Sequence, residues 1–111
     1  MKISKDSKTI WVASSKSRGS MSSIHYSRDQ GETWNEIENV PQIGVNQINV
    51  IEREDKKIII IGSWKNGVFI LENEKWTKIE KIDFNVISEI LLNNNELLIG
   101  SWGNGVYNIK L

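Results

Sequence analysis

The 111-residue sequence contains no cysteine and only one proline, Pro41. Without cysteine, neither a disulfide framework nor a thiolate metal site is available to stabilise the fold. Lysine plus arginine and aspartate plus glutamate number 14 each, so the formal net charge is zero. Such a chain has no overall positive field that would attract nucleic acid or an anionic membrane, and we expect neither as a partner.

Long apolar runs are also missing. The charged residues 1–10 are not followed by the apolar stretch of a signal peptide, and no segment is long enough to span a membrane. No ten residues carry apolar side chains at helical spacing. Eleven short apolar segments separated by polar turns remain, which is the pattern of an all-β protein. The predicted strands are Lys2–Lys5, Thr9–Ser14, Ser23–Ser27, Thr33–Glu38, Gln47–Arg53, Lys57–Ser63, Val68–Glu72, Lys75–Glu80, Ile87–Leu92, Glu96–Ser101 and Val106–Leu111.

A nine-residue motif occurs twice. IGSWKNGVF at residues 61–69 returns as IGSWGNGVY at residues 99–107, with seven of nine positions identical and a period of 38 residues. A fixed period of about 20 to 50 residues is typical of solenoids, propellers and arrays. The Asn-Gly pair in each copy predicts a tight hairpin, because glycine adopts positive φ without a steric penalty.

The predicted strands group in fours around this repeat, in units of residues 1–39, 40–82 and 83–111, and the last unit has only three strands. Residues 58–61 are apolar at every position, which indicates a strand buried on both faces. The first unit has a longer polar loop at residues 15–22. We predict an all-β fold: a β-propeller fragment of about three four-stranded antiparallel blades, the last lacking its outer strand.

Residues 27–34, SRDQGETW, match the pattern Ser-x-Asp-x-Gly-x-Thr-Trp at all five specified positions. This segment resembles the Asp box, the bacterial neuraminidase repeat, and the IGSW motifs look like two-component-regulator propeller repeats. The resemblance implies a propeller with a structural box and an extracellular or periplasmic location. Ser27 and Asp29 would bond the turn, Gly31 would take left-handed geometry beside Thr33, and Trp34 would pack back between strands.

In a propeller of this strand order, the loops between second and third strands and the connections between blades emerge on one face, where the resemblance places ligands. An indole stacks on the CH face of a sugar, and an asparagine amide offers a donor and an acceptor, so we predict a glycan or another small polar ligand. The same side chains also fit a structural role in packing between blades and shaping turns. The candidate ligand-binding residues are Trp64, Lys65, Asn66, Trp102, Asn104 and Arg18.

The sequence nominates no catalytic residue, metal ligand or cofactor. Arg18, Arg28 and Arg53 fall on three different turns, so they do not form the carboxylate-binding cluster of a sialidase. The acidic residues lie mainly in turns and outer strands and offer no glycosidase pair. We therefore predict a non-catalytic binding module, with a protein-interaction scaffold or a fragment of a larger propeller as the alternative.

Three blades leave an open fan, whereas propellers close with about four to eight blades. The uncovered flanks would favour association. We expect the ring to be completed either by the remainder of a larger propeller or by a second copy arranged head to tail, giving about six blades.

Overall fold

The computed structural model describes residues 2–5, 8–17, 20–53, 56–63, 66–80, 86–92, 96–101, 103 and 105–110. These residues form an all-β structure without a helix, and so without a helix long and apolar enough to cross a membrane. The strands are β1 (Lys2–Lys5), β2 (Ile10–Ser17), β3 (Ser20–Ser27), β4 (Asn35–Glu36), β5 (Val45–Arg53), β6 (Lys56–Ser63), β7 (Val68–Glu72), β8 (Lys75–Lys78), β9 (Val86–Leu92), β10 (Glu96–Ser101) and β11 (Val106–Lys110).

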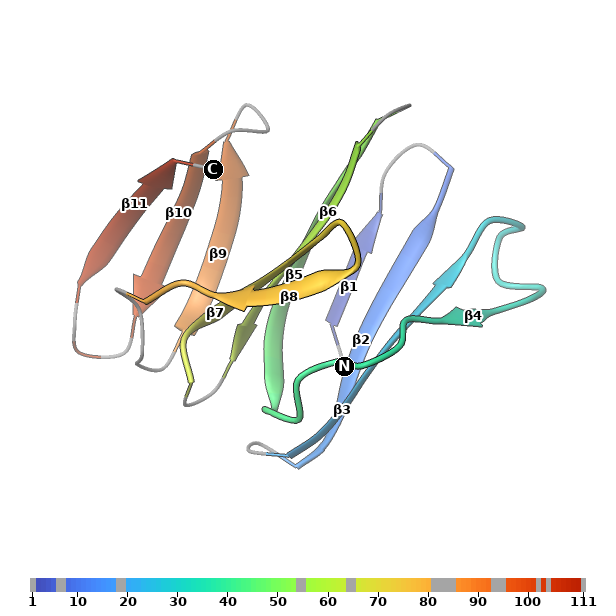
Figure 1. Ribbon diagram of the computed structural model, residues 1–111, viewed down its shortest axis with the longest axis horizontal. Coiled ribbons are helices and arrows are strands. Elements are labelled where there is room, and N and C mark those ends of the chain that lie inside the picture. Colours follow the sequence, from blue (N-terminus) through green and yellow to red (C-terminus); the bar gives the residue numbers. More distant parts are fainter. Residues whose placement is uncertain are drawn as a thin grey trace.

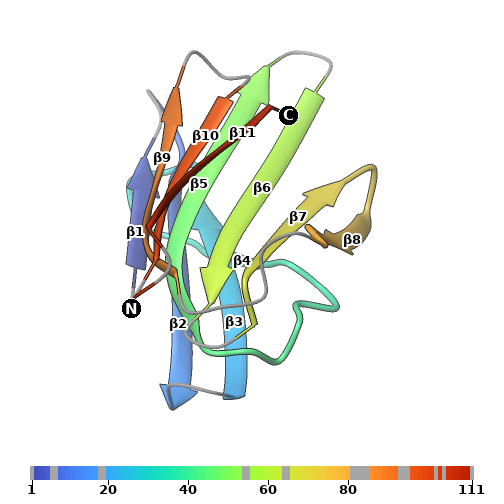
Figure 2. The same cartoon turned by 90° about the vertical axis from the view of Figure 1, so that its left-hand side faces the viewer.

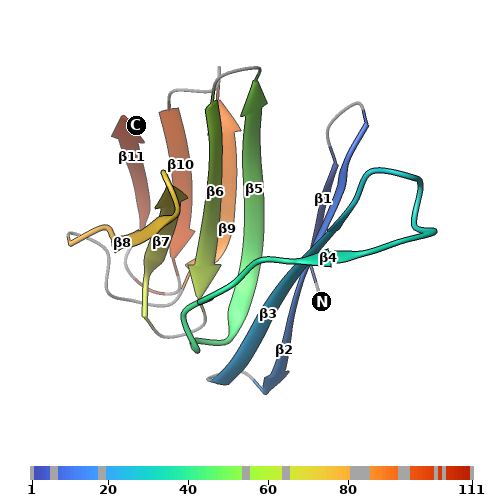
Figure 3. The same ribbon diagram turned by 45° about the vertical axis from the view of Figure 1, so that its right-hand side comes forward.

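The strands form three antiparallel sheets, in the orders β1-β2-β3-β4, β5-β6-β7-β8 and β9-β10-β11, which we call sheets 1, 2 and 3. Sheet 2 lies between the other two, and its first strand, β5, contacts both β1 and β9 (Figures 1 and 3). The strand grouping of four, four and three agrees with the grouping indicated by the sequence. The assignment of residues 1–39, 40–82 and 83–111 to propeller blades stays a prediction.

Strand β6 is buried on both faces, as the apolar run predicts. Ile59 and Ile61 belong to a core between sheets 1 and 2, whereas Ile58 and Ile60 belong to a second core between sheets 2 and 3. The split follows from the pleat, because successive side chains of a strand point to opposite faces. Their exposed fractions are between 0% and 4%, so one strand contributes to two cores at once.

The prediction of a loop at residues 15–22 is wrong. β2 runs to Ser17 and β3 begins at Ser20, and the two strands pair as far as Ser17 opposite Ser20. The hydroxyls of Ser14 and Ser23, which face each other across the pair, are hydrogen-bonded at 2.9 Å. Serine-rich polar sequence is typical of loops, but cross-strand hydroxyl bonds and the backbone ladder support a strand here.

The serine hairpin also anchors the connection between sheets 1 and 2. Ser22 accepts a hydrogen bond from the Ile43 amide at 3.2 Å, and Ser15 accepts one from the Val45 amide at 2.7 Å. Gln42 donates to the Ser22 carbonyl at 3.0 Å. Because Ile43 and Val45 are buried, their amides need such partners, and the hydroxyls supply them.

Strand β4 is only two residues long, shorter than the predicted Thr33–Glu38. Thr33 is held in the preceding turn by its hydrogen bonds to Asp29. Asn39 has a φ of +60°, which ends the extended conformation beyond Glu38. The outermost strand of sheet 1 is therefore bounded on both sides by turn geometry. In Figure 2, β1 and β9 lie on the left and β8, the outer strand of sheet 2, lies on the right.

Candidate functional site

Strands β2, β6 and β10 all end at one edge of the molecule, the lower edge in Figure 1, where residues 40–44 also lie. We call this the loop edge. It comprises the C-terminal ends of these three strands, the starts of β3, β7 and β11, and residues 40–44. The arrangement is the one expected from the strand order, since antiparallel neighbours turn alternately at opposite edges. The loop edge is therefore where repeated loops can meet a ligand.

Two corners of the loop edge are closed by the same hydrogen bonds. The amide and the hydroxyl of Ser63 both donate to the Gly67 carbonyl, at 2.8 and 2.9 Å. Ser101 repeats this toward the Gly105 carbonyl, at 3.0 and 2.8 Å. The Ser63 hydroxyl also accepts a bond from the Asn66 amide at 2.7 Å. Sequence reasoning missed the serine, although its recurrence in both IGSW motifs was the available signal.

Gly67 and Gly105 have φ values of +78° and +82°, as the Asn-Gly turns predict. We expect Gly105→Ala to destabilise the protein by about 1 to 2 kcal/mol, because an L-residue is strained in the left-handed region. A Cβ at Gly105 would meet no atom within 4 Å, so the effect would be conformational alone. Urea unfolding would measure it, with Gly105→Asn as the control, since asparagine tolerates this region better. Equal losses for both variants would contradict a φ-based cause.

Of the six predicted ligand-binding residues, the structure describes Asn66, which is exposed at the loop edge. Trp64, Lys65, Trp102, Asn104 and Arg18 lie outside the described residues. Their role in binding stays a prediction.

Residues 27–34 form a closed turn between β3 and β4, as predicted. The buried Ser27 hydroxyl accepts a bond from the Gly31 amide and donates to Asp29 Oδ1, each at 2.8 Å. Asp29 Oδ1 also accepts the Thr33 amide at 2.8 Å, and its other oxygen accepts the Thr33 hydroxyl. Gly31 has a φ of +93°. Every polar group of Asp29 is therefore used inside the turn, which is a structural role.

These bonds hold the pKa of Asp29 near 2, below its ordinary value of 3.8, chiefly through the Thr33 hydroxyl, then the Thr33 amide and the Ser27 hydroxyl. A depressed carboxyl pKa means that the ionised form favours the folded state. The stabilisation is complete above about pH 4 and is lost as the pH falls toward 2. A carboxyl NMR titration should give a midpoint near 2 for Asp29, moving up toward 3.8 in Thr33→Val. A midpoint near 3.8 in the unmodified protein would contradict the bonding pattern.

The prediction that Trp34 packs back between strands is wrong. Its side chain is 45% exposed, and its Nε1 donates to the Gly31 carbonyl at 3.1 Å. A Cβ built on Gly31 would lie 3.7 Å from the indole, so the ring covers the turn glycine. Trp76, the corresponding residue of sheet 2, is instead half-buried against the core between sheets 1 and 2. The short β4 leaves Trp34 in the turn rather than in the strand.

An aromatic pair with two cations lies on sheets 1 and 2. The rings of Trp11 and Tyr26 are 4.8 Å apart, and Lys57 Nζ lies 5.6 Å from both ring centres. Arg28 lies 5.3 Å from the Tyr26 ring and donates to the Thr9 hydroxyl at 3.3 Å. Cations over ring faces are attracted by the π electrons. Arg28 is thus held against its own sheet.

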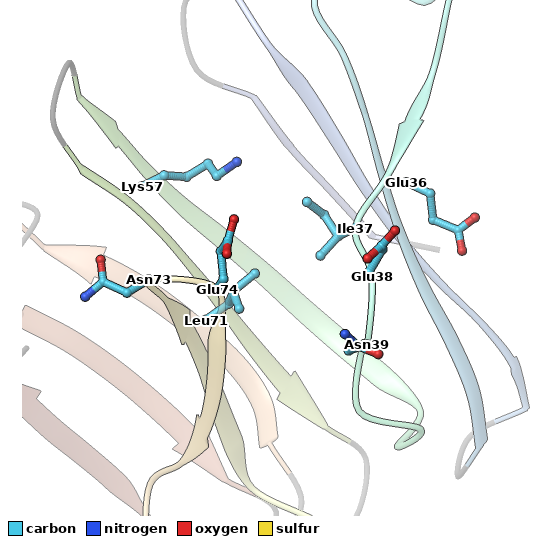
Figure 4. A pocket seen from close by; sticks show the side chains of 8 residues that line it. All are labelled: Glu36, Ile37, Glu38, Asn39, Lys57, Leu71, Asn73 and Glu74. Atoms are coloured by element: carbon cyan, nitrogen blue, oxygen red, sulfur yellow. The ribbon is translucent and has the colours of Figure 1, made fainter.

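A cleft of about 520 Å³ opens between the outer parts of sheets 1 and 2 (Figure 4). Ile37 points across the gap toward the wall that carries Leu71 and Glu74, whereas Glu36 points away from it. The Glu36 carboxylate lies 3.5 Å from His25 Nε2. The cleft is lined by Glu36, Ile37, Glu38, Asn39, Lys57, Leu71, Asn73 and Glu74.

The carboxylates of Glu38 and Glu74 outnumber the single ammonium group of Lys57, which gives this cleft a negative character, and Ile37 and Leu71 add apolar surface to its two walls. Such a lining suits an amine-bearing ligand better than an anionic one. Asn66, the predicted ligand-binding residue that the structure describes, does not line it. Sequence reasoning could not have found it, because the residues of its two walls are between 18 and 38 positions apart in the chain.

In the part of the chain that the structure describes, no group of three or more His, Cys, Asp or Glu residues is placed to hold a metal ion. Comparison with known proteins gives no further guide: no family model, no curated protein and no solved structure matches this chain.

Proposed function

We propose that the chain is a segment of a β-propeller that serves as a non-catalytic binding module. The observation that carries the proposal is the repeated packing of one sheet on the next through equivalent positions. In sheet 1, Trp11 lies two residues before Ala13, and in sheet 2, Ile60 lies two residues before Gly62. Each of these small residues pairs with the third strand of its own sheet. Trp11 faces sheet 2, and Ile60 faces sheet 3.

The same direction of packing in successive sheets is what a radial array of blades requires. The contacts of β5 with β1 and β9 add support, because the first strands of the sheets then lie together on one side, where a propeller has its axis. On this reading sheets 1, 2 and 3 are blades of residues 1–39, 40–82 and 83–111.

The proposed ligand is a glycan or another small polar molecule bound at the loop edge. Two equivalent corners, built by Ser63 with Gly67 and by Ser101 with Gly105, would present Trp64 and Trp102 in the same way. An indole stacks on the CH face of a pyranose, and exposed Asn66 offers an amide to its hydroxyls. Successive sugar units of a glycan would then contact the two equivalent corners.

The alternative is a scaffold without a small ligand. The closing bonds of Ser63 and Ser101 favour it in one respect, because they explain the recurrence of the motif by turn geometry alone. In that case both tryptophans would serve packing between blades, and their loss would destabilise the fold rather than a complex.

A glycan-binding screen with the unmodified protein, Trp64→Ala and Trp102→Ala tests these two functions. We expect each variant to lose roughly fivefold or more in affinity while keeping its β-sheet circular dichroism, since removing one stacked indole removes a contact worth about 1 kcal/mol or more. Trp34→Ala is the matched control, because this exposed tryptophan lies in the turn between β3 and β4. Unfolding of both loop variants, or binding that survives in both, would contradict the glycan site.

A further inference from the structure

The three sheets differ in how well their equivalent positions are covered. Ile24, Val68 and Val106 occupy one repeat position on the third strand of each sheet, opposite Ala13, Gly62 and Gly100 respectively. We call the sheet face that carries them the forward face. Ile24 and Val68 are fully buried by the following sheet, but Val106 is 71% exposed. The forward face of sheet 3 is therefore uncovered at a position that is covered twice elsewhere.

The opposite face, the rear face, shows the reverse pattern. Ile61 of sheet 2 and Ile99 of sheet 3 are 0% exposed, because the preceding sheet packs on them. Their counterpart in sheet 1 is Val12, which precedes Ala13 as Ile61 precedes Gly62. Val12 is half-buried, and its neighbour across the pair, His25, has a side chain 38% exposed. The rear face of sheet 1 thus carries Val12 where sheets 2 and 3 carry buried isoleucines, beside the polar His25, Ser14 and Ser23, and none of the described sheets packs on it.

We infer that the forward face of sheet 3 binds the rear face of sheet 1 of a second copy of this chain, head to tail. Within one chain, the rear face of sheet 2 packs on sheet 1, and the rear face of sheet 3 packs on sheet 2 and covers Val68. The rear face of sheet 1 is the equivalent surface, so it is the one expected to cover Val106. Two copies joined in this way have two identical contacts and six sheets, which is within the range in which propellers close.

This inference rests on the proposed propeller packing, but it does not depend on any ligand. The competing occupant of both faces is the remainder of a larger propeller, in which case this chain by itself would stay monomeric. A symmetric contact between two forward faces is a further competitor, and it would leave the rear face free.

Light scattering on the full chain gives the first test, with an expected mass of twice the 12.7 kDa chain. Val106→Asp on the forward face and Val12→Asp on the rear face should each weaken association about 30-fold or more, because a charge replaces an apolar side chain in the contact. His25→Asp is a second rear-face variant if Val12→Asp loses its β-sheet signal. Gln30→Asp, exposed in the Asp-box turn, is the control for added charge and should keep the doubled mass.

Mixing the two variants is the decisive step. The Val12→Asp variant keeps an unmodified forward face, and the Val106→Asp variant keeps an unmodified rear face. An equimolar mixture of the two variants should therefore regain the doubled mass, because these two faces form one intact contact. A monomeric unmodified protein, or a rear-face variant that stays dimeric, would overturn the inference. A monomeric protein that still binds glycan would overturn the inference but leave the proposed function intact. A dimer that binds no glycan would contradict only the proposed ligand.

Discussion

Trp11→Ala is expected to lower the free energy of unfolding by about 3 to 5 kcal/mol, which is a large part of the total of a small domain. Trp11 is 0% exposed and packs in the core between sheets 1 and 2. It also stacks against Tyr26 at 4.8 Å and lies under Lys57. Its removal leaves a cavity at the junction of two sheets. Urea unfolding followed by circular dichroism would measure the loss.

Trp11→Phe is the matched control. Among the described residues the buried Nε1 of Trp11 has no hydrogen-bond partner, so phenylalanine gives up volume without losing a hydrogen bond. We expect it to be clearly less damaging than alanine. A Trp11→Phe protein as unstable as Trp11→Ala would mean that the indole nitrogen is bonded after all, and an unaffected Trp11→Ala would mean that the core is misplaced.

Ile59→Ala and Ile60→Ala are each expected to destabilise the protein by about 2 to 5 kcal/mol, but in different places. Ile59 lies in the core toward sheet 1 and Ile60 in the core toward sheet 3, and both are 0% exposed. Hydrogen exchange should therefore rise first in β1–β4 for Ile59→Ala and in β9–β11 for Ile60→Ala, because each variant weakens the docking of one neighbour.

Val106→Ala serves as the control for this pair, since its side chain is 71% exposed. We expect it to change stability by about 0.5 kcal/mol or less under dilute conditions in which the chain is monomeric. Identical exchange patterns for the two isoleucine variants would contradict a β6 shared between two cores.

Local patterns predicted most of the strands. β1, β7 and β10 have the predicted bounds, and the isoleucine run of β6 is buried on both faces as its lack of alternation indicates. Gly67 and Gly105 of the Asn-Gly turns and Gly31 of the turn after β3 have positive φ, because only a residue without Cβ enters that region without strain. These features depend on a few neighbouring residues, and the sequence contains all of them.

The errors arose where a residue's partner is distant in the chain. The Ser15 and Ser22 hydroxyls bond amides 30 and 21 residues away, so a serine-rich stretch that looks like a loop is a hairpin. Trp34 is a different case, because its indole bonds the Gly31 carbonyl only three residues away, and the short β4 leaves the residue in the turn. The acid-lined cleft has no local signal, since Glu38 and Glu74 meet only when sheets 1 and 2 pack.

The 38-residue repeat by itself determined the order of the strands, the turns at Gly67 and Gly105, and the edge at which the repeated corners emerge. Side-chain period, turn chemistry and strand order are sufficient for these features. Only the tertiary structure decided that equivalent residues differ, with Val68 buried and Val106 exposed. The burial of a side chain depends on whether another sheet lies against its face. Two copies of one motif can therefore have the same local structure and still differ in burial, because their neighbours differ.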